Sequence, residues 1–543
     1  MKNSILIFIL VLFSFYSCDD VFDVAPQDKI SENNVWNDET LLRLYLNACY
    51  TATFQQGLYR NTQIGAATDE IHSIKNAGNY YIIQRNELTA DNVRDLNDYL
   101  NNWKSAYSTI RDVNIFFEKI DEAPVSDDVK EEMKGEMHFI RAFLYSQLLW
   151  RYGGVPIITE VFELNDDYDR SRDSYDDCLQ FILDEIDEAI AVLPDKQEGD
   201  DLGKASADAA RALKARLLLY AASPLNNPEN DISKWQAAAN AAEELIGKYS
   251  LHNDYQQLFL GHSDEVIFAR YFTQQNSHDL SLQVGRNGDN GWGSDSPTQN
   301  LVDDYEMDNG EFPFLDDGSV NPASGYNPDN PYDGRDPRFY ASILYDGSFW
   351  MGRETETFEG GLDSRDGPIA AWNGTMTGYY LKKFVPEDIP PTGSTVRPTT
   401  PWIMFRYAEV LLNYAEASFM LGTAEGEETA RQYLNMVRNR PGVEMPPVDA
   451  TGENLLDRIR HERRIELVFE GHRYFDVRRW KIADETESKN IMGVTIEKNG
   501  NTKTYIPKQL VERSWDDRLY RLPIPQVEID RSNGALDQNP GYY

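Results

Sequence analysis

The sequence predicts a mainly α-helical protein, in which a tetratricopeptide-like scaffold of helical hairpins carries a long, irregular insert with short strands. Two observations support this fold class. Apolar residues recur at three- and four-residue steps over two long parts of the chain, as in Trp103, Tyr107 and Ile110, which is typical of amphipathic helices. Between about residues 251 and 401 this periodicity fades, and Gly, Pro, Asn and Asp become frequent.

The first helical part covers about residues 39–249. Pro124 interrupts it, and Gly153-Gly154 ends one of its helices. Helix pairs of similar size follow one another, which is typical of an array in which each hairpin buries its apolar face on the next. The expected helices are 41–53, 101–120, 127–150, 175–193, 205–222 and 232–248.

The insert is expected to be loop-rich, with short strands such as residues 265–269. Its acidic stretch 303–336 invites comparison with a calcium-binding EF-hand loop. Asp329, Asp333 and Gly334 fit positions 1, 5 and 6 of that loop, but Tyr340 stands at position 12, where a bidentate Glu is required. The pattern therefore favours a solvated, turn-rich surface over a calcium site.

Helical periodicity resumes at Trp402 and continues to Gly422, and residues 427–439 form the partner helix. We therefore expect four parts, in which the C-terminal helical pairs and tail pack on the N-terminal scaffold in one interleaved body. The parts are a signal peptide (1–17), an N-terminal helical scaffold (18–250), a loop-rich insert (251–401) and C-terminal helical pairs with a tail (402–543).

A late stretch, residues 458–481, combines apolar and charged residues on one helical half. Thr451 is expected to cap this helix and Gly471 to end it. Glu462, Glu466 and Glu470 lie at i, i+4 and i+8 on the apolar half, with several arginines close by. A catalytic glutamate pair would need one raised pKa, whereas flanking arginines keep both ionised. We therefore expect a structural Arg/Glu network.

The first residues predict a secreted protein. Lys2 precedes an apolar run over residues 5–15, which is too short to span a bilayer and is typical of a signal peptide. Ser17-Cys18 ends it and resembles a relaxed bacterial lipobox, so cleavage before Cys18 and acylation of its thiol are expected. Ordinary cleavage nearby, with an incidental cysteine, is the alternative.

The charge balance and the cysteines limit the function classes. A formal net charge of −38 repels nucleic acid and anionic membranes, so no nucleic-acid partner is expected. Besides Cys18, only Cys49 and Cys178 are present. Both lie in helical patterns, where buried free thiols are expected, although a bridge between them stays open.

No catalytic or metal-binding motif is found in the sequence. Its seven histidines are scattered, and there is no HExxH, GxSxG, phosphate loop, GxGxxG or CxxC pattern. His461 and His472, beside the Arg/Glu stretch, are expected to be structural. The sequence therefore predicts a protein that is not an enzyme and needs no cofactor.

Aromatic residues make up 12% of the chain, and many fall in predicted loops. The apolar faces of sugar rings stack on Trp and Tyr, and sugar hydroxyls need planar polar partners such as Asp and Asn. Trp292 stands between glycines that permit close approach of a ligand. Loop anchoring or core packing remains the alternative for each aromatic residue. The candidate ligand-binding residues are Asp69, Asn76, Asn79, Tyr80, Tyr81, Trp292, Trp350 and Trp372.

Several segments, in order, resemble landmarks of the SusD/RagB family of surface lipoproteins. They include HFIRAFLYSQLLWRYGGVPII (138–158), FRYAEVLLNYAEA (405–417), RRIELVFEGHRYFDVRRW (463–480) and LDQNPGYY (536–543), and together they span nearly the whole mature chain. The resemblance implies an eight-helix tetratricopeptide-like scaffold with an irregular ligand-binding half. It also implies a ligand near the Asp of a Thr-x-Asp-type segment, which supports Asp69.

The protein is therefore expected to be a non-catalytic outer-membrane lipoprotein that faces the cell exterior. It would bind oligosaccharide or polysaccharide and pass it to a SusC-like TonB-dependent transporter. Peptide cargo within the same class is the first alternative, and a helical scaffold that binds only other proteins is the second.

Overall fold

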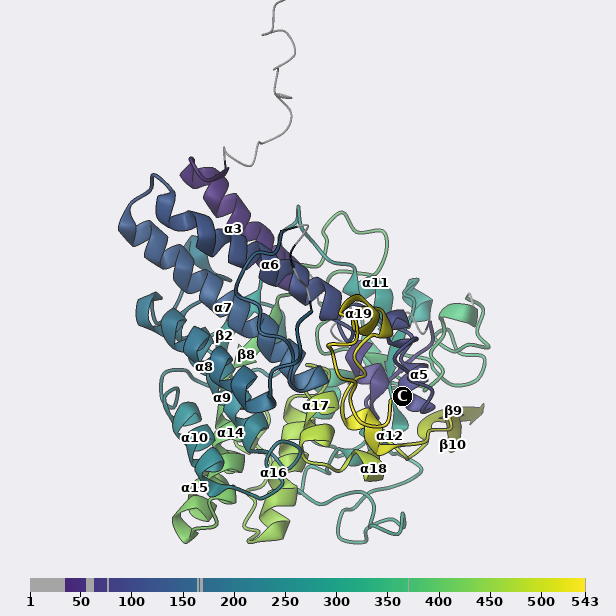
Figure 1. The fold of residues 1–543 in the computed structure, drawn as a ribbon. Helices are drawn as coiled ribbons and strands as arrows, with labels where there is room; N and C mark the ends of the chain where they lie inside the picture. The colour runs from purple at the N-terminus through teal and green to yellow at the C-terminus, as the bar shows by residue number, and fades with distance from the viewer. Residues whose placement is uncertain are drawn as a thin grey trace, which may run out of the picture.

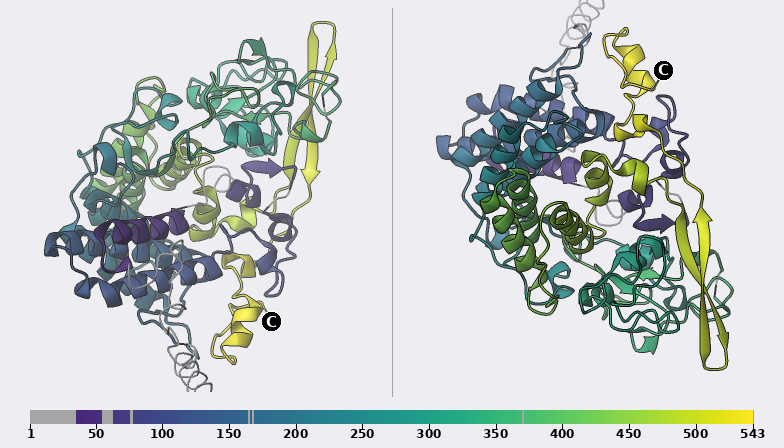
Figure 2. Two further views of the ribbon diagram at one scale, coloured as in Figure 1. Left: turned by 90° about the horizontal axis from the view of Figure 1, so that it is seen from above. Right: turned by 90° about the horizontal axis from the view of Figure 1, so that it is seen from below.

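The computed structural model describes residues 35–54, 63–75, 78–163, 166, 169–369 and 371–542. Long helices form one half of the molecule, and irregular segments with short strands form the other (Figures 1 and 2). The long helices are α3 (Glu39–Phe54), α6 (Trp103–Lys119), α7 (Asp127–Tyr152), α8 (Tyr175–Val192), α9 (Ala207–Ala222), α10 (Ile232–Glu243), α14 (Tyr407–Met420), α15 (Ala424–Arg438) and α16 (Glu453–Glu466).

Local sequence signals start several of these helices. Ser126, Ser174 and Ser206 are the N-cap residues of α7, α8 and α9, and each accepts a hydrogen bond from a backbone N–H in the first turn. Acidic residues follow in each first turn, where the positive end of the helix dipole stabilises them. The tetratricopeptide-like, mainly α-helical class predicted from the sequence is confirmed.

The helices form a continuous array that the insert interrupts. Successive helices from α6 to α10 pack on one another, α3 packs on α6 and α7, and α10 packs on α14, which contacts α15 and α16. At the base of the insert, β2 (Val266–Arg270) pairs antiparallel with β8 (Trp402–Arg406), with Ala269 opposite Ile403. The chain thus leaves the array after α10 and rejoins it at α14.

The irregular half contains short helices and two-stranded sheets. A long hairpin of β9 (Ile491–Asn499) and β10 (Thr502–Val511) extends along its edge (Figure 2). The other strand pairs are β1 (Ile71–Ser73) with β3 (Asp295–Pro297), β4 (Ile343–Leu344) with β7 (Tyr380–Leu381), and β5 (Phe349–Trp350) with β6 (Arg353–Glu354). The short helices are α5 (Tyr81–Gln84), α11 (Leu280–Val284), α12 (Gln299–Asp304), α13 (Pro337–Ser342), α17 (Arg473–Arg479), α18 (Ala483–Thr486) and α19 (Gln526–Arg531). The 3₁₀ turns are η3 (Gln63–Ala67), η4 (Val93–Asp95), η5 (Ile120–Glu122), η6 (Gly199–Asp201), η7 (Gln257–Phe259), η8 (Asn287–Asp289), η9 (Ala371–Asn373) and η10 (Asp517–Tyr520).

A buried network of arginines and carboxylates joins the two halves. Glu466 of α16 is paired with Arg338 of α13, Arg406 of β8 and Arg440 after α15, at 3.0, 2.7 and 2.6 Å. Burial alone would raise the pKa of Glu466, but these guanidinium groups hold it well below its usual range. Further pairs in the network are Glu462–Arg438, Glu470–Lys383, Glu265–Arg440, Glu306–Arg438, Glu416–Arg479 and Asp476–Arg463.

The structure differs from the sequence prediction at both ends of α16 and agrees with it for two of the cysteines. The N-cap residue of α16 is Gly452 rather than Thr451, and α16 ends at Glu466 rather than at Gly471. Cys49 and Cys178 are buried free thiols, as predicted. Cys18 lies outside the described residues. None of the helices in the described part of the chain is both long and apolar enough to cross a membrane.

Candidate ligand-binding site

The pairing of β1 with β3 brings together two segments that are far apart in the sequence. Ser73 lies opposite Asp295, and the backbone N–H of Ile74 donates to the carbonyl of Ser294 at 2.9 Å. At the other end of the pair, Thr298 Oγ1 donates to the carbonyl of Asp69 at 2.5 Å. The segment that follows Asp69 and the loop that carries Trp292 therefore lie side by side in the irregular half.

Two tryptophans and a lysine meet at this junction. The ammonium of Lys75 lies 3.6 Å from the ring centroid of Trp292 and 5.7 Å from that of Trp372. Trp292 is half-buried, whereas Trp372, in η9, is 61% exposed. The cluster thus has an open aromatic face, Trp372, beside a cation held over Trp292. We name Lys75, Trp292 and Trp372 the Lys75 cluster.

The glycines that flank Trp292 stand where neighbouring backbone segments pack closely. The N–H of Trp292 donates to the carbonyl of Leu282 at 2.8 Å. A Cβ at Gly291 would lie 2.3 Å from the carbonyl carbon of Gly285, and a Cβ at Gly293 would lie 2.7 Å from the carbonyl oxygen of Asn373. A side chain at Gly293 would push the loops of Trp292 and Trp372 apart, and one at Gly291 would displace the backbone at Gly285. In this structure the glycines permit close approach of neighbouring backbone, which is a different reason from the ligand approach inferred from the sequence.

Buried polar groups lie beneath the Lys75 cluster. Burial raises the pKa of Asp295 to about 7, although the nearby Lys75 ammonium acts in the opposite direction. Burial likewise lowers the pKa of Lys75 itself, while Asp295 and Asp279 act to raise it. His72 is buried, and both of its ring nitrogens lack a hydrogen-bond partner within the described residues. Burial and the charge of Arg365 lower the pKa of His72 to about 4, so its ring is neutral at pH 7.

Tyr81 connects to the same place. Its hydroxyl donates to the carbonyl of Ser73 at 2.7 Å, and its ring stacks on that of His72 with centroids 6.2 Å apart. Tyr81 is half-buried and belongs to α5, not to a loop as the sequence suggested. Trp292, Trp372 and Tyr81 are thus the predicted aromatic residues that the structure brings together around β1 and β3.

Three other predicted residues are buried away from solvent. Tyr80 is 1% exposed, and its hydroxyl accepts a hydrogen bond from Asn97. Trp350, in β5, is 3% exposed. Asp69 is bound by Arg473 at 3.0 Å and by Arg464 at 2.8 Å. Asn79 is half-buried with a positive φ of 56°, and Asn76 lies outside the described residues.

The ionisation of Asp69 fits a role in the ion-pair network. Burial alone would raise its pKa, but Arg464 and Arg473 hold it well below its usual range. Both oxygens of the carboxylate are engaged by Arg473. Sequence reasoning missed Lys75 and Arg365, because neither residue stands in a motif and only the tertiary fold places Lys75 beside the tryptophans and Arg365 near His72.

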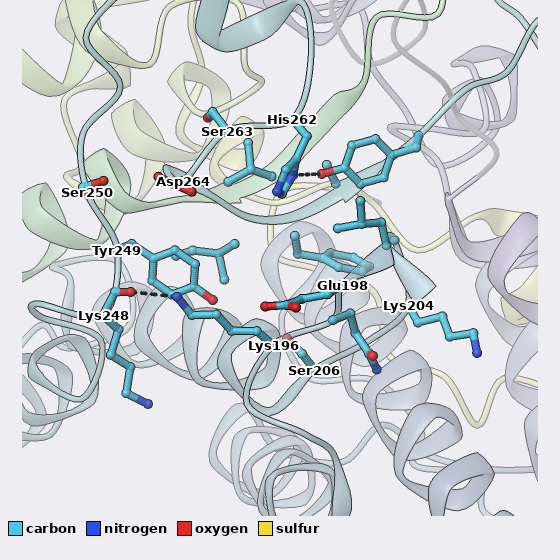
Figure 3. Close-up of a pocket in the computed structure, with 18 of the residues that line it drawn as sticks. Lys196, Glu198, Lys204, Ser206, Lys248, Tyr249, Ser250, His262, Ser263 and Asp264 are labelled. Atoms are coloured by element: carbon cyan, nitrogen blue, oxygen red, sulfur yellow. Dashed lines mark hydrogen bonds between the residues drawn. The ribbon is translucent and has the colours of Figure 1, made fainter. Parts of the chain in front are cut away.

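Further hollows lie in the helical half. A cavity of about 410 Å³ lies between the loop after α8 and the segments around Tyr249 and His262 (Figure 3). Its Lys196 donates to the carbonyl of Lys248 at 2.8 Å and covers the ring of Tyr249 at 3.8 Å, so the cation and the ring satisfy each other. A larger hollow of about 880 Å³ lies beside α6. Neither has the open tryptophan face of the Lys75 cluster among its lining residues.

Within the described ranges, no three His, Cys, Asp or Glu side chains gather as metal ligands would. Glu70, beside Asp69, is buried, and burial raises its pKa to about 8 despite the charge of Arg464. A neutral Glu next to an ionised Asp can suit proton transfer. Both side chains are enclosed by protein, and they face the ion-pair network instead of the open aromatic face.

Comparison with known proteins gives a consistent family. The family model described as the SusD family matches residues 264–542, and one described as starch-binding associating with outer membrane matches residues 20–219. A SusD-like protein of Formosa agariphila is 27% identical over 507 residues, covering 86% of this chain and 89% of its own length.

Solved structures agree. The crystal structure of a SusD-like protein from Bacteroides fragilis has 30% identity and a TM-score of 0.80, covering 95% of this chain and 100% of its own. A second B. fragilis structure, described as a SusD-like carbohydrate-binding protein, has 25% identity and a TM-score of 0.77, covering 92% and 99%. With a matching family model over more than half of its length and relatives along nearly all of it, this chain belongs to the SusD family.

Proposed function

We propose that this protein binds oligosaccharide or polysaccharide at the Lys75 cluster. The observation that carries the proposal is the exposed ring of Trp372 beside Trp292 and Lys75. A large apolar ring left 61% exposed costs free energy in water, and the apolar face of a sugar ring can cover it. The ammonium of Lys75 and the hydroxyl of Tyr81 supply hydrogen bonds for sugar hydroxyls. The relative described as carbohydrate-binding supports the same function.

A binding screen tests this proposal directly. The wild-type protein is titrated with plant, host and microbial polysaccharides, and with peptides as the rival cargo. Trp372→Ala is expected to weaken binding of the best glycan by about 1–3 kcal/mol, on the scale of aromatic stacking on nucleobases. Phe349→Ala is the matched control, because Phe349 is also an exposed aromatic residue but does not belong to the Lys75 cluster.

Each outcome decides between the candidates. Binding of peptides alone would replace the glycan by peptide cargo, and binding of neither would favour a scaffold that contacts only proteins. Incubation of any bound glycan with the protein, followed by product analysis, tests the expectation that the protein is not an enzyme. Unchanged glycan would agree with that expectation.

We further propose that acylated Cys18 anchors the protein to the outer membrane, and that a SusC-like TonB-dependent transporter receives the glycan. Support comes from the apolar run that ends at Ser17-Cys18 and from the family. Affinity purification of the tagged protein from outer membranes is expected to retrieve such a transporter. Retrieval of the protein alone, from a preparation that still binds glycan, would argue against delivery while leaving the binding function intact.

A further inference from the structure

Resting on the proposed function, we propose that the ligand of the Lys75 cluster is an anionic glycan, a polysaccharide that carries carboxylate or sulfate groups. The observation behind this is the charge state of the site. Lys75 lies at the aromatic face with no carboxylate of the described residues within ion-pair distance, and the charge of Arg365 acts on His72 at the base of the site. A neutral sugar can accept hydrogen bonds from Lys75, but only an anionic group would also neutralise its charge.

Lys75 is held by aromatic rings and not by an ion pair. Its ammonium lies 3.6 Å from the centroid of Trp292. In the part of the chain that the structure describes, no carboxylate oxygen lies within 4.0 Å of it. An ammonium has three N–H donors, and the face of an aromatic ring is only a weak acceptor for them. Lys75 therefore keeps donors for an anionic group that enters beside Trp372.

Arg365 supports the turn that carries Trp372. A Cβ at Gly374, two residues after Trp372, would lie 2.8 Å from the Cα of Arg365, so the two backbones are in close contact. Arg365 is half-buried, and among the described residues its guanidinium has neither an ion pair nor a hydrogen bond. Its charge reaches His72, at the base of the site. Arg365 thus adds positive charge at the base of the site, whereas Lys75 lies at its aromatic face.

The acidic groups nearby leave a positive balance. Asp295 faces Lys75 but is buried, with a pKa raised to about 7, so it carries only part of a charge near neutral pH. Asp279 is exposed and lies beyond ion-pair distance of Lys75. The positive groups are Lys75, Arg365 and, at the edge of the site, Arg85. The guanidinium carbon of Arg85 lies 5.2 Å from the ring centroid of Tyr81. The neutral His72 adds nothing to this balance.

The excess of positive charge at the site contrasts with the net negative charge of the whole protein. With a net charge of −38, the protein repels polyanions at long range, so it can bind one only where cations are concentrated. In the buried network, Arg338, Arg406 and Arg440 each meet carboxylates. Partly desolvated cations without such partners are costly unless a ligand supplies the missing anion. An anionic sugar on Trp372 would supply it.

Pairs of polysaccharides that share a backbone test the inference. We suggest polygalacturonate with its methyl ester, carboxymethyl with hydroxyethyl cellulose, and dextran sulfate with dextran, each titrated calorimetrically at one fixed salt concentration. At least one charged member is expected to bind the wild-type protein roughly tenfold or more tightly than its neutral partner.

Three variants assign that preference to the site. Lys75→Met keeps the length and the contact with Trp292 but removes the charge, so binding of the charged member should fall by roughly ten- to 100-fold. Lys75→Arg should restore most of it. Lys119→Met is the control, because Lys119 is exposed at the end of α6 in the helical half, and it should bind like the wild type. Melting curves show whether each variant is folded.

Every outcome is decisive. Equal or tighter binding of the neutral members would overturn the inference and leave the proposed glycan function standing. A preference for the charged members that survives Lys75→Met would also overturn it, because the charge recognition would then lie elsewhere. Failure of the wild type to bind any charged or neutral member would count against the inference and the proposed function together.

Discussion

The carboxylate of Glu466 lies 2.6 Å from the guanidinium of Arg440, and both side chains are completely buried. This pair joins α16 to the end of α15, and Arg406 extends the contact to the strand that closes the insert. Glu466→Ala should therefore leave buried cations unpaired and reduce the free energy of unfolding by about 3–5 kcal/mol. Urea denaturation, followed by circular dichroism, measures this.

An exposed pair provides the control for that substitution. Glu428 lies on the surface of α15, with its side chain 72% exposed and paired with Arg431. Glu428→Ala should change the free energy of unfolding by less than about 1 kcal/mol. If both variants unfolded at the wild-type midpoint, the ion pairs of Glu466 would not contribute to the stability of the fold.

Trp350 and Trp372 offer a second contrast. Both are candidates from the sequence, but the first is 3% exposed and the second 61%. Trp350→Ala should leave a cavity and cost about 3–5 kcal/mol of stability. Trp372→Ala should leave the melting temperature nearly unchanged while it weakens glycan binding. Thermal melting alongside calorimetric titration separates them, and the reverse pattern would place the ligand at Trp350.

The sequence predicts the fold well because its main signals are local. Helical periodicity depends on residues a few positions apart, and it locates α7, α8 and α9 closely. The C-terminal end of α16 depends on distant residues. The carbonyl of Glu466 accepts hydrogen bonds from Tyr255 and Arg406, and that of Val468 from Lys383. These donors satisfy carbonyls at the end of the helix, so it stops at Glu466 without needing Gly471.

The candidate site was only partly predictable for the same reason. Glycines beside Trp292 mark a special backbone position, and the structure places that residue in the Lys75 cluster. Tyr80 and Tyr81 look alike in sequence, yet one is buried in the core and the other lies at the site. That difference arises from α5, where neighbouring residues point in different directions. Lys75 carries no local signal at all.

Glu136 predicts a dependence of stability on pH. It is buried in α7, and burial raises its pKa to about 7, although the hydroxyl of Tyr50 donates to it at 2.6 Å. In the unfolded chain the pKa would be about 4.3. The folded state therefore binds the extra proton between these values, so stability falls as the pH rises from about 4 to about 7.

Glu136→Gln isolates that contribution. Glutamine keeps an oxygen for the Tyr50 hydroxyl but cannot ionise, so the variant should lose less stability than the wild type between pH 5 and pH 8, by about 2 kcal/mol. Urea denaturation at both pH values provides the comparison. Parallel losses in the two proteins would mean that Glu136 is already ionised in the folded state.

The proposed anchor has a simple test. Cys18→Ala removes the thiol that would be acylated, so the protein should move from the membrane fraction to the soluble fraction when expressed in its host. Metabolic labelling with palmitate should mark the wild type and leave the variant unlabelled. Labelled variant protein would show that another residue carries the lipid.

A substitution at Asp69 distinguishes a structural role from a ligand-binding role. The sequence proposes Asp69 as a ligand residue, but the structure surrounds it with arginines. Asp69→Asn removes the charge that Arg473 and Arg464 share. Arg464 keeps a second partner in Asp304, at 2.7 Å. The variant should therefore lose about 3 kcal/mol of stability, at the lower end of the range for broken buried pairs.

The pH dependence of that loss has a definite sign. The arginines hold the pKa of Asp69 well below its usual range, so its contribution is fully present above the unfolded pKa of about 3.9 and declines as the pH falls below it. The gap in unfolding free energy between the wild type and Asp69→Asn should accordingly shrink as the pH falls below 4. If Asp69 acts only through the fold, the folded variant should bind glycan with wild-type affinity. A variant of wild-type stability that no longer binds would make Asp69 the ligand contact that the sequence suggested.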